Sequence, residues 1–181
     1  HPSDAPRVPY VTGLLEASGI AAHQHESALV ALDKFDKVGE SGVAAEFASR
    51  GIDSQAAHRI IEMLRDIYAI PMDGQESSAA LINSSRLEAI GSYLAGTEQR
   101  AGVENLAEIV HLTEATGAAT HVVVNPRLAR GLSYYTGAIM EIAVPELAGS
   151  LGAGGRYDNL IGTFLGREVP ACGFSLGLER I

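Results

Sequence analysis

The sequence RGLSYYTG occupies residues 130–137, and the segments GAGGRYD and GFSLGLER follow it at 152–158 and 173–180. Each segment places an arginine or a pair of tyrosines beside glycines. Glycine lets a backbone approach a ligand closely, and the arginine guanidinium is a rigid fork that fits phosphate or carboxylate. These segments therefore predict a site for an anionic ligand. A glycine pair such as Gly154-Gly155 has a second interpretation, because it also marks bulges and crowded packing sites in strands.

The residues around these segments predict β-strands that follow one another along the chain. Short apolar or alternating runs bounded by turn residues are typical of strands. No crossover helix separates most of them, which favours antiparallel pairing. The expected strands cover residues 121–124, 138–144, 149–156 and 171–175, with a helix between the last two at 158–165.

The chain before residue 119 has the opposite character. Residues 26–118 are rich in alanine, with apolar residues at helical spacing, and they predict an almost entirely helical region. A helix is expected over 10–18, ended by Gly19, and another over 26–37, ended by Gly39. Asp53 is an expected N-cap for a helix over 54–67.

Composition limits the functional classes. The chain has 181 residues with a net charge of −9, 46% hydrophobic and 19% charged residues, and no apolar run long enough to cross a membrane. The acidic balance argues against general binding to polyanions but not against a local basic patch. The single cysteine, Cys172, excludes an intramolecular disulfide, and its apolar setting predicts a buried thiol. The six histidines have no metal-ligand spacing, so no metal site is expected.

In this order and spacing, the three segments resemble the signatures of the histidyl-tRNA synthetases, which are class II aminoacyl-tRNA synthetases. RGLSYYTG resembles the histidine-binding signature, GGRYD the second signature and GFSLGLER class II motif 3. The segment ALDKFDKVG at 31–39 resembles the opening of the helical insertion domain in many bacterial members.

The resemblance implies an α+β fold, with part of a class II synthetase-like antiparallel sheet and a mostly helical insertion domain. It also implies three parts. Residues 1–25 would be a catalytic-domain segment, 26–118 the insertion domain and 119–181 the catalytic sheet with the histidine signatures and motif 3.

The implied activity is that of a histidine–tRNA ligase, which activates histidine with ATP and transfers it to tRNA-His. ATP with Mg²⁺ would be a substrate, and no tightly bound cofactor is expected. The full-length protein would be a cytoplasmic homodimer with no membrane association.

The resemblance also assigns roles to residues. Arg130 matches the catalytic arginine that contacts the α-phosphate and the histidine carboxylate, and Arg180 matches the motif 3 arginine that binds ATP. Tyr134 and Tyr135 match the histidine pocket, although they would point to opposite faces of a regular strand. Ser133 stands where many members have aspartate. The flat strand beneath the histidine would consist of Gly152, Gly154 and Gly155.

Contacts with tRNA are predicted from charge alone. Basic side chains of the helical region would meet the acceptor stem, while the alternative for such residues is a solvated face of paired charges. The candidates are Lys34, Lys37, Arg50, Arg59 and Arg65.

Motifs 1 and 2 of class II synthetases are not recognisable before Arg130, and no anticodon-binding domain follows motif 3. We therefore expect a fragment that is inactive by itself. One alternative function is the histidine-binding regulatory subunit of ATP phosphoribosyltransferase, which generally lacks the helical insertion. Another is a synthetase-like tRNA-sensing module, although such modules tend to lose the residues that match Arg130, Tyr135 and Arg180.

Overall fold

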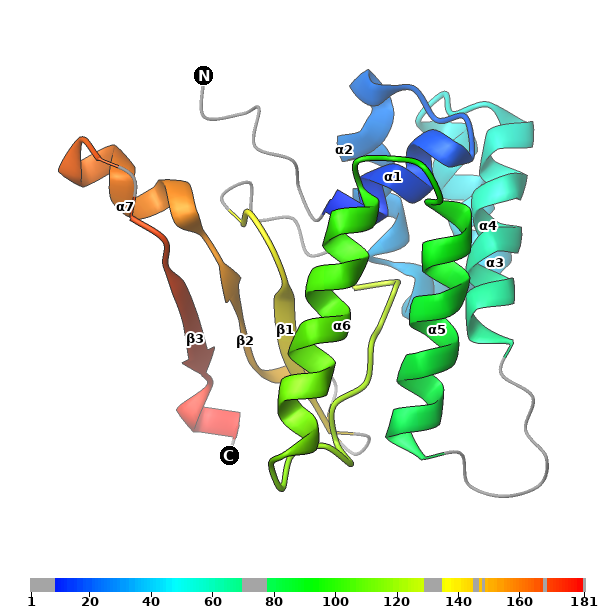
Figure 1. Ribbon diagram of the computed structural model, residues 1–181. Coiled ribbons are helices and arrows are strands. Elements are labelled where there is room, and N and C mark those ends of the chain that lie inside the picture. The colour runs from blue at the N-terminus through cyan, green and yellow to red at the C-terminus, as the bar shows by residue number, and fades with distance from the viewer. Residues whose placement is uncertain are drawn as a thin grey trace. The chain divides into compact units, whose positions relative to one another are not determined.

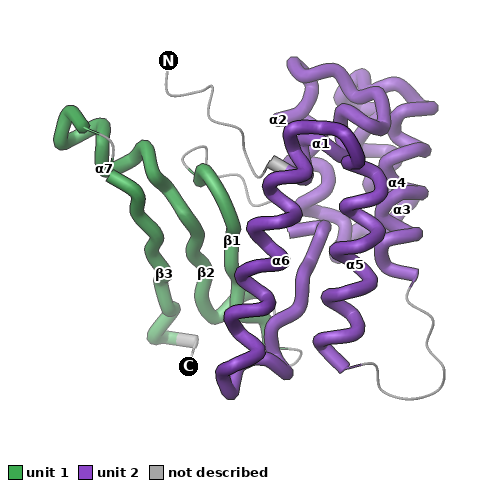
Figure 2. Tube along the Cα trace, in the orientation of Figure 1, with its two compact units in different colours: residues 1–8, 132–181 green, residues 9–131 purple. Residues whose placement is uncertain are grey.

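The computed structural model describes residues 9–69, 78–128, 135–144, 147, 149–167 and 169–180 (Figure 1). The chain divides into two compact units, residues 9–131 and residues 132–181 with 1–8 (Figure 2). The first unit is helical and the second contains a small antiparallel sheet, which confirms the predicted α+β class. The predicted parts were 1–25, 26–118 and 119–181. In the structure, helix α1 and residues 119–131 belong to the helical unit, so the boundaries of the two units differ from the predicted ones. No helix of the described ranges is long and apolar enough to cross a membrane.

The helical unit is built around one apolar core. Its elements are α1 (Pro9–Ala17), the 3-10 helix η2 (Ala22–Gln24), α2 (His25–Leu32), α3 (Phe35–Ser49), α4 (Ser54–Tyr68), α5 (Ala79–Tyr93) and α6 (Arg100–Glu114). Burial of large apolar side chains is the main force that packs such helices together. The fully buried side chains include Leu14, Leu15, Leu32, Phe47, Ile60, Leu64, Ile67, Ile90 and Leu94.

Glycines end α1 and α3 in the same way. Gly19 has φ 88°, and the amide of Ile20 donates to Leu15 O at 2.9 Å. Gly51 has φ 70°, and the amide of Ile52 donates to Phe47 O at 3.0 Å. Each is a Schellman motif, in which a left-handed residue lets the chain satisfy the last helical carbonyls. The stop predicted at Gly19 is thus confirmed.

The helix expected over 26–37 is divided in the structure. α2 ends at Leu32 and α3 begins at Phe35, so two helices replace one. Gly39 lies inside α3 with φ 66° and ψ −175°, which makes a kink. The helical geometry is therefore interrupted at Gly39, as predicted, and a further helical stretch of α3 follows directly after it.

The start of α4 has the predicted cap. The Asp53 carboxylate accepts hydrogen bonds from the amides of Gln55 and Ala56, both at 3.0 Å. These amides belong to the first turn, where no helical carbonyl is available to them. The cap therefore fixes where α4 begins.

The sheet contains β1 (Ile139–Ala143), β2 (Ser150–Arg156) and β3 (Cys172–Leu176) in the order β1-β2-β3. Both pairs are antiparallel, as predicted, and Gly154 pairs with Met140 on one side and Phe174 on the other. Helix α7 (Asp158–Leu165) lies between β2 and β3 in the chain, and the 3-10 helix η3 (Leu178–Arg180) follows β3. The middle strand therefore carries the glycines of the second signature.

The strand expected at residues 121–124 does not form. These residues belong to the helical unit, where Val124 is buried and Val123 is 45% exposed. The Asn83 amide group donates to Val122 O at 2.8 Å and accepts from the Val124 amide at 2.7 Å. A side chain of α5 thus satisfies the backbone groups that a neighbouring strand would otherwise pair.

Candidate functional site

The described part of the predicted site lies in the sheet unit. Tyr135 and the three glycines of β2 are described, whereas Arg130 and Tyr134 lie outside the described residues. Arg180 is the last residue of η3, and its side chain also lies outside the described part. The described part of the site therefore consists of β2 and the groups that pack on it.

The ring of Tyr135 lies directly against the backbone of β2 at Gly155. A Cβ atom at Gly155 would be 2.8 Å from Cδ1 and Cε1 of Tyr135, and equally close to the carbonyl oxygen of Ala138. Tyr135 is only 8% exposed. Glycine is therefore required at this position for the ring to occupy its place.

The other two glycines meet β3 on the opposite face. A Cβ atom at Gly152 would be 2.8 Å from Cε1 of Phe174, and one at Gly154 would overlap the carbonyl oxygen of Gly173. Successive residues of a strand face opposite sides, which separates Gly155 from this pair. The glycines thus serve close packing on both faces of β2, and whether they also border a bound histidine stays a prediction.

Backbone hydrogen bonds extend the sheet back toward Tyr135. The amide of Thr136 donates to Arg156 O at 2.8 Å, and the amide of Arg156 donates to Ala138 O at 3.0 Å. The rings of Tyr135 and Tyr157 have centroids 6.5 Å apart and planes tilted by 45°. The two signature segments therefore form one hydrogen-bonded structure at the end of β2.

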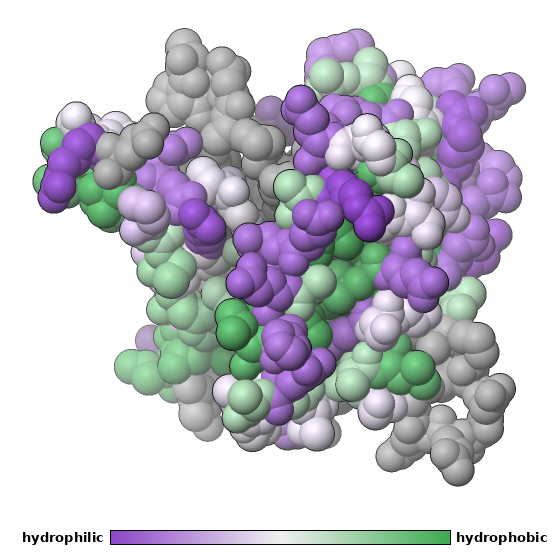
Figure 3. Space-filling view, in the orientation of Figure 1, coloured by the Kyte–Doolittle hydropathy of each residue, from purple (hydrophilic) through white to green (hydrophobic). Residues whose placement is uncertain are grey.

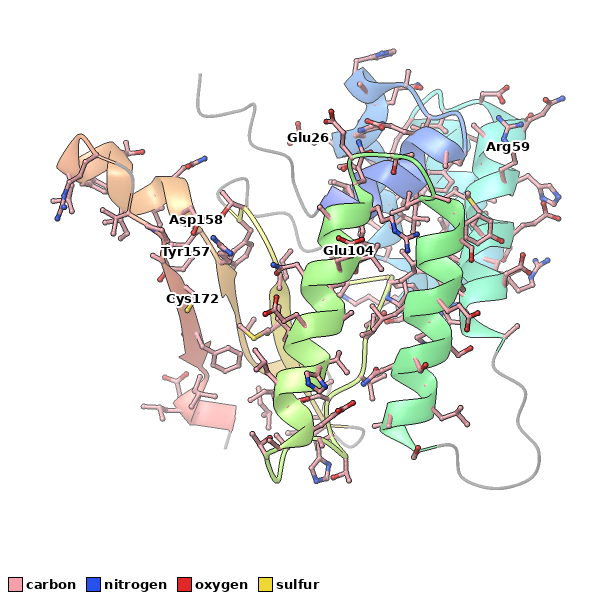
Figure 4. All side chains as sticks on the ribbon, viewed as in Figure 1. Glu26, Arg59, Glu104, Tyr157, Asp158 and Cys172 are labelled. Atoms are coloured by element: carbon pink, nitrogen blue, oxygen red, sulfur yellow. The ribbon has the colours of Figure 1, made fainter. Side chains whose placement is uncertain are left out.

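Arg156 has a structural partner at this end of the sheet. Its Nε atom donates to both carboxylate oxygens of Asp158, at 2.9 and 2.8 Å. Oδ1 of Asp158 also accepts from the Ala171 amide at 3.3 Å, which ties the start of α7 to the residue before β3. Figure 4 shows Tyr157 and Asp158 after β2, near Cys172 of β3. The Cys172 thiol is exposed, so the prediction of a buried thiol was wrong.

The two faces of the sheet differ in chemistry. Glu141, Ala153 and Ser175 are paired across the three strands, on the face that Tyr135 covers at Gly155. Sequence reasoning did not select Glu141 or Ser175, although the acidic residue in the apolar run 138–144 was a usable signal.

Exposed apolar side chains cover the other face, and hydrophobic residues gather over the lower part of β3 in Figure 3. They are Met140, Ile142, Phe174 and Leu176, with exposed fractions of 42–51%. The face of Tyr135 thus carries Glu141 and Ser175, whereas these four positions of the opposite face are apolar.

Most of the basic residues predicted to meet tRNA have partners within the helical unit. Lys34 and Arg50 both contact the carboxylate of Glu46, each at 2.8 Å. Hydrogen bonds from Lys34 and Arg50 lower the pKa of Glu46 below its usual value. The structure therefore brings these two cations together, but around an acidic group that offsets their charge.

Arg65 and Arg59 are also engaged. Arg65 forms an ion pair with Glu40 at 2.6 Å, and its hydrogen bond lowers the pKa of that carboxylate. Nε of Arg59, labelled in Figure 4, donates to Ser18 O at 2.7 Å at the end of α1. Lys37 is exposed and has no ion-pair partner among the described residues. The contact of these residues with tRNA stays a prediction.

Among the described residues, no group of three or more histidine, cysteine, aspartate or glutamate side chains could hold a metal ion.

Comparison with known proteins supplies the family. The family model for histidyl-tRNA synthetase matches residues 7–181. The chain belongs to the histidyl-tRNA synthetase family. It is 38% identical over 171 residues to the histidine–tRNA ligase of Leifsonia xyli, a match that covers 94% of this chain and 38% of that protein. The cytoplasmic histidine–tRNA ligase of Arabidopsis thaliana is 35% identical over 172 residues, covering 93% of this chain and 18% of the relative.

The fold agrees with this family. The crystal structure of histidyl-tRNA synthetase from Nostoc sp. PCC 7120 matches with a TM-score of 0.76 and 29% identity, covering 95% of this chain and 38% of that chain. The chain therefore spans less than two fifths of the length of each of these relatives. The resemblance inferred from the three signatures is confirmed.

Proposed function

We propose that the protein carrying this chain is a histidine–tRNA ligase, which activates histidine with ATP and transfers it to tRNA-His. The observation that supports this most directly is the family match over residues 7–181, which includes all three signature segments. The placement of Tyr135 against the bare backbone of β2 adds a local reason, because it joins the first signature to the second.

In the proposed reaction, a carboxylate oxygen of histidine attacks the α-phosphorus of ATP and pyrophosphate leaves. Negative charge concentrates on the α-phosphate in the transition state, so a fixed guanidinium directed at it lowers the barrier. Arg130 would supply that group and would also hold the histidine carboxylate. The transfer step then moves the histidyl group from AMP to the terminal ribose of tRNA-His.

Tyr134 and Tyr135 would recognise the histidine side chain. A phenol hydroxyl donates to or accepts from an imidazole nitrogen, and a site built for that pairing rejects apolar amino acids. The ring of Tyr135 is held against β2 at Gly155, which fixes where its side chain lies relative to the glycines of the second signature. The resemblance also assigns Gly152, Gly154 and Gly155 to the histidine site, and of these three Gly155 lies on the face of β2 that Tyr135 covers.

The remaining partners follow from the same activity. Arg180 would bind ATP, and Mg²⁺ would arrive with ATP as part of the substrate rather than as a resident metal. Lys34, Lys37, Arg50, Arg59 and Arg65 remain candidates for the acceptor stem, and Lys37 is the exposed one without an ion-pair partner among the described residues. We also propose a homodimer and a cytoplasmic location for the whole protein.

Histidine-dependent ATP–pyrophosphate exchange by the full-length gene product tests this function. We expect exchange in the wild type and a loss of about 100-fold or more in Arg130→Ala, the usual effect of removing one preorganised charge-stabilising group. Arg167→Ala is the matched control, because Arg167 is an exposed arginine of the same unit. Absence of exchange from the folded wild type, or an equal loss in both variants, would refute the assignment.

A further inference from the structure

One charged side chain interrupts the apolar run of β1, the strand that lies beside β2 (Figure 1). Glu141 lies between Met140 and Ile142, and glutamate is less common in strands than branched or aromatic residues. It is directly opposite Ala153 of β2, which in turn is opposite Ser175 of β3, so these three residues form a row across the sheet. The side chain directly across from Glu141 is thus apolar, and pairing between the strands does not explain the carboxylate.

Two tyrosine rings cover the next row on the same face. Tyr135 lies against Gly155, and a Cβ atom at Gly173 would overlap the hydroxyl of Tyr157. The two ring centroids are 6.5 Å apart. Residues two apart in a strand share a face and are about 7 Å apart, which relates Gly155 to Ala153 in the row. The carboxylate of Glu141 therefore belongs to a face that is partly covered by aromatic rings, rather than to an open polar face.

The surface between the carboxylate and the rings consists of small residues. Ala153 has a single methyl group, and Gly155 and Gly173 have no side chain. Glu141 and Ala153 are partly exposed, and Ser175 is exposed. Neighbouring strands are about 4.8 Å apart, so the row from β1 to β3 spans roughly 10 Å. A ligand of the size of one amino acid fits on this part of the sheet.

Glu141 gives this face a negative charge. The arginine of β2, Arg156, is three positions from Ala153, so it faces the other side of the strand, and its guanidinium bonds to Asp158. A carboxylate accepts charge-assisted hydrogen bonds from cationic nitrogen groups. Its two oxygens have several lone pairs, so it can bond to a group of the protein and to a ligand at the same time. A small ligand with an N–H donor matches this chemistry.

We propose that Glu141 is a specificity-determining residue that accepts a hydrogen bond from a nitrogen of the histidine substrate. This inference rests on the proposed function, in which this sheet binds histidine. The donor is the α-ammonium group or an imidazole N–H, since both are nitrogen donors on the same small molecule. Histidine lies over the small residues of β2, with one nitrogen at Glu141. Loss of the carboxylate then weakens the binding of histidine and leaves the binding of ATP unchanged.

The test uses pyrophosphate exchange by the full-length protein. Glu141→Gln keeps the size of the side chain and removes its charge, and Glu141→Ala removes the carboxylate a second way if the glutamine variant does not fold. Glu108→Gln is the matched control, because it makes the same chemical change at an exposed glutamate of α6. The readouts are kcat, KM for histidine, KM for ATP and the melting temperature. Imidazolepropionate, which is histidine without its α-amino group, serves as a competitive inhibitor.

We expect Glu141→Gln to raise KM for histidine about tenfold or more, the effect of losing one hydrogen bond to a charged group. Both kcat and KM for ATP should stay within about threefold of the wild type, because the lost contact binds histidine equally before and during the reaction. Glu108→Gln should keep all three values. A structural role of Glu141 would instead change KM for ATP or kcat as much as KM for histidine.

The inhibitor identifies the nitrogen. If Glu141 binds the α-ammonium group, imidazolepropionate should inhibit Glu141→Gln as strongly as the wild type. If it binds the imidazole, inhibition should weaken by the same factor as the rise in KM for histidine. A KM for histidine at the wild-type value in the folded variant, or an equal rise in KM for ATP, would overturn the inference. A wild type without exchange would overturn the proposed function instead.

Discussion

Replacement of Gly155 by alanine tests the close packing of the two signature segments. The added Cβ atom would be 2.8 Å from the Tyr135 ring, whereas ordinary contact begins at 3.4 Å, so the ring must move by 3.4 − 2.8 = 0.6 Å. The carbonyl oxygen of Ala138 is equally close and accepts a hydrogen bond from the Arg156 amide, so the backbone cannot widen without weakening that bond. Overpacking of this kind costs about 1–3 kcal/mol, and we expect about 2 kcal/mol here.

Hydrogen exchange measured by mass spectrometry on the chain reports this cost locally. The amides of Thr136 and Arg156 join Tyr135's segment to β2, and their exchange follows the free energy of local opening. A loss of about 2 kcal/mol corresponds to exchange about 30-fold faster at these amides.

The matched control is Gly117→Ala. A Cβ atom at Gly117 would meet no atom within 4 Å, and Gly117 does not have a positive φ. Its exchange pattern in the sheet should equal that of the wild type. Wild-type protection of Thr136 and Arg156 in Gly155→Ala would refute the conclusion that the Tyr135 ring requires glycine beneath it.

Three further predictions concern the helical unit and can be checked by thermal unfolding followed with circular dichroism. Asp53→Ala removes the cap of α4 and should cost about 1 kcal/mol, while Asp53→Asn should retain most of the stability; equal melting temperatures for both would contradict the role of the cap. Gly91→Ala should stabilise α5 by about 0.5–1 kcal/mol, because the new methyl group would be 3.7 Å from its nearest neighbour, an ordinary contact; a lower melting temperature would show hidden crowding. The pKa of Glu40 is lowered from 4.5 by Arg65, so this carboxylate stabilises the fold above that pH. The difference in melting temperature between Glu40→Gln and the wild type should therefore shrink as the pH falls through the lowered pKa, and a difference that grows on acidification would reverse the sign.

Local signals predicted the elements whose causes are local. Gly19 ends α1 because a left-handed residue is needed there, and Asp53 begins α4 because its carboxylate reaches two free amides. Such effects involve residues two to five apart, so the sequence alone contains them. Gly39 interrupts the helical geometry for the same local reason, but the sequence reasoning did not predict that a further helical stretch of α3 follows directly after it.

Features that depend on distant residues could not be predicted. Residues 121–124 have the composition of a strand. However, the side chain of Asn83, about 40 positions earlier, bonds the carbonyl of Val122 and the amide of Val124. These backbone groups therefore do not have to pair with a neighbouring strand. Similarly, Lys34 appeared available for tRNA, and only the fold brings Glu46 within 2.8 Å of it.

The candidate site was predictable in its residues but not in its geometry. The order and spacing of the three signatures indicated the family, because both can be read directly from the sequence. The contact of Tyr135 with Gly155 depends on the register of β1 and β2, which the sequence does not state. The same holds for the row formed by Glu141, Ala153 and Ser175.

The pairing of aromatic rings with glycines in β2 has a consequence for the fidelity of folding. A glycine-rich strand has few side chains to distinguish one alignment from the next, so slippage is a hazard. Phe174 lies opposite Gly154, and a shift by one residue would place it opposite Ala153 or Gly155 and turn it to the other face. A shift by two in one direction would place it opposite the long side chain of Arg156. The pattern of glycines in β2 thus disfavours the alignments that shift Phe174 by one residue or by two residues toward Arg156.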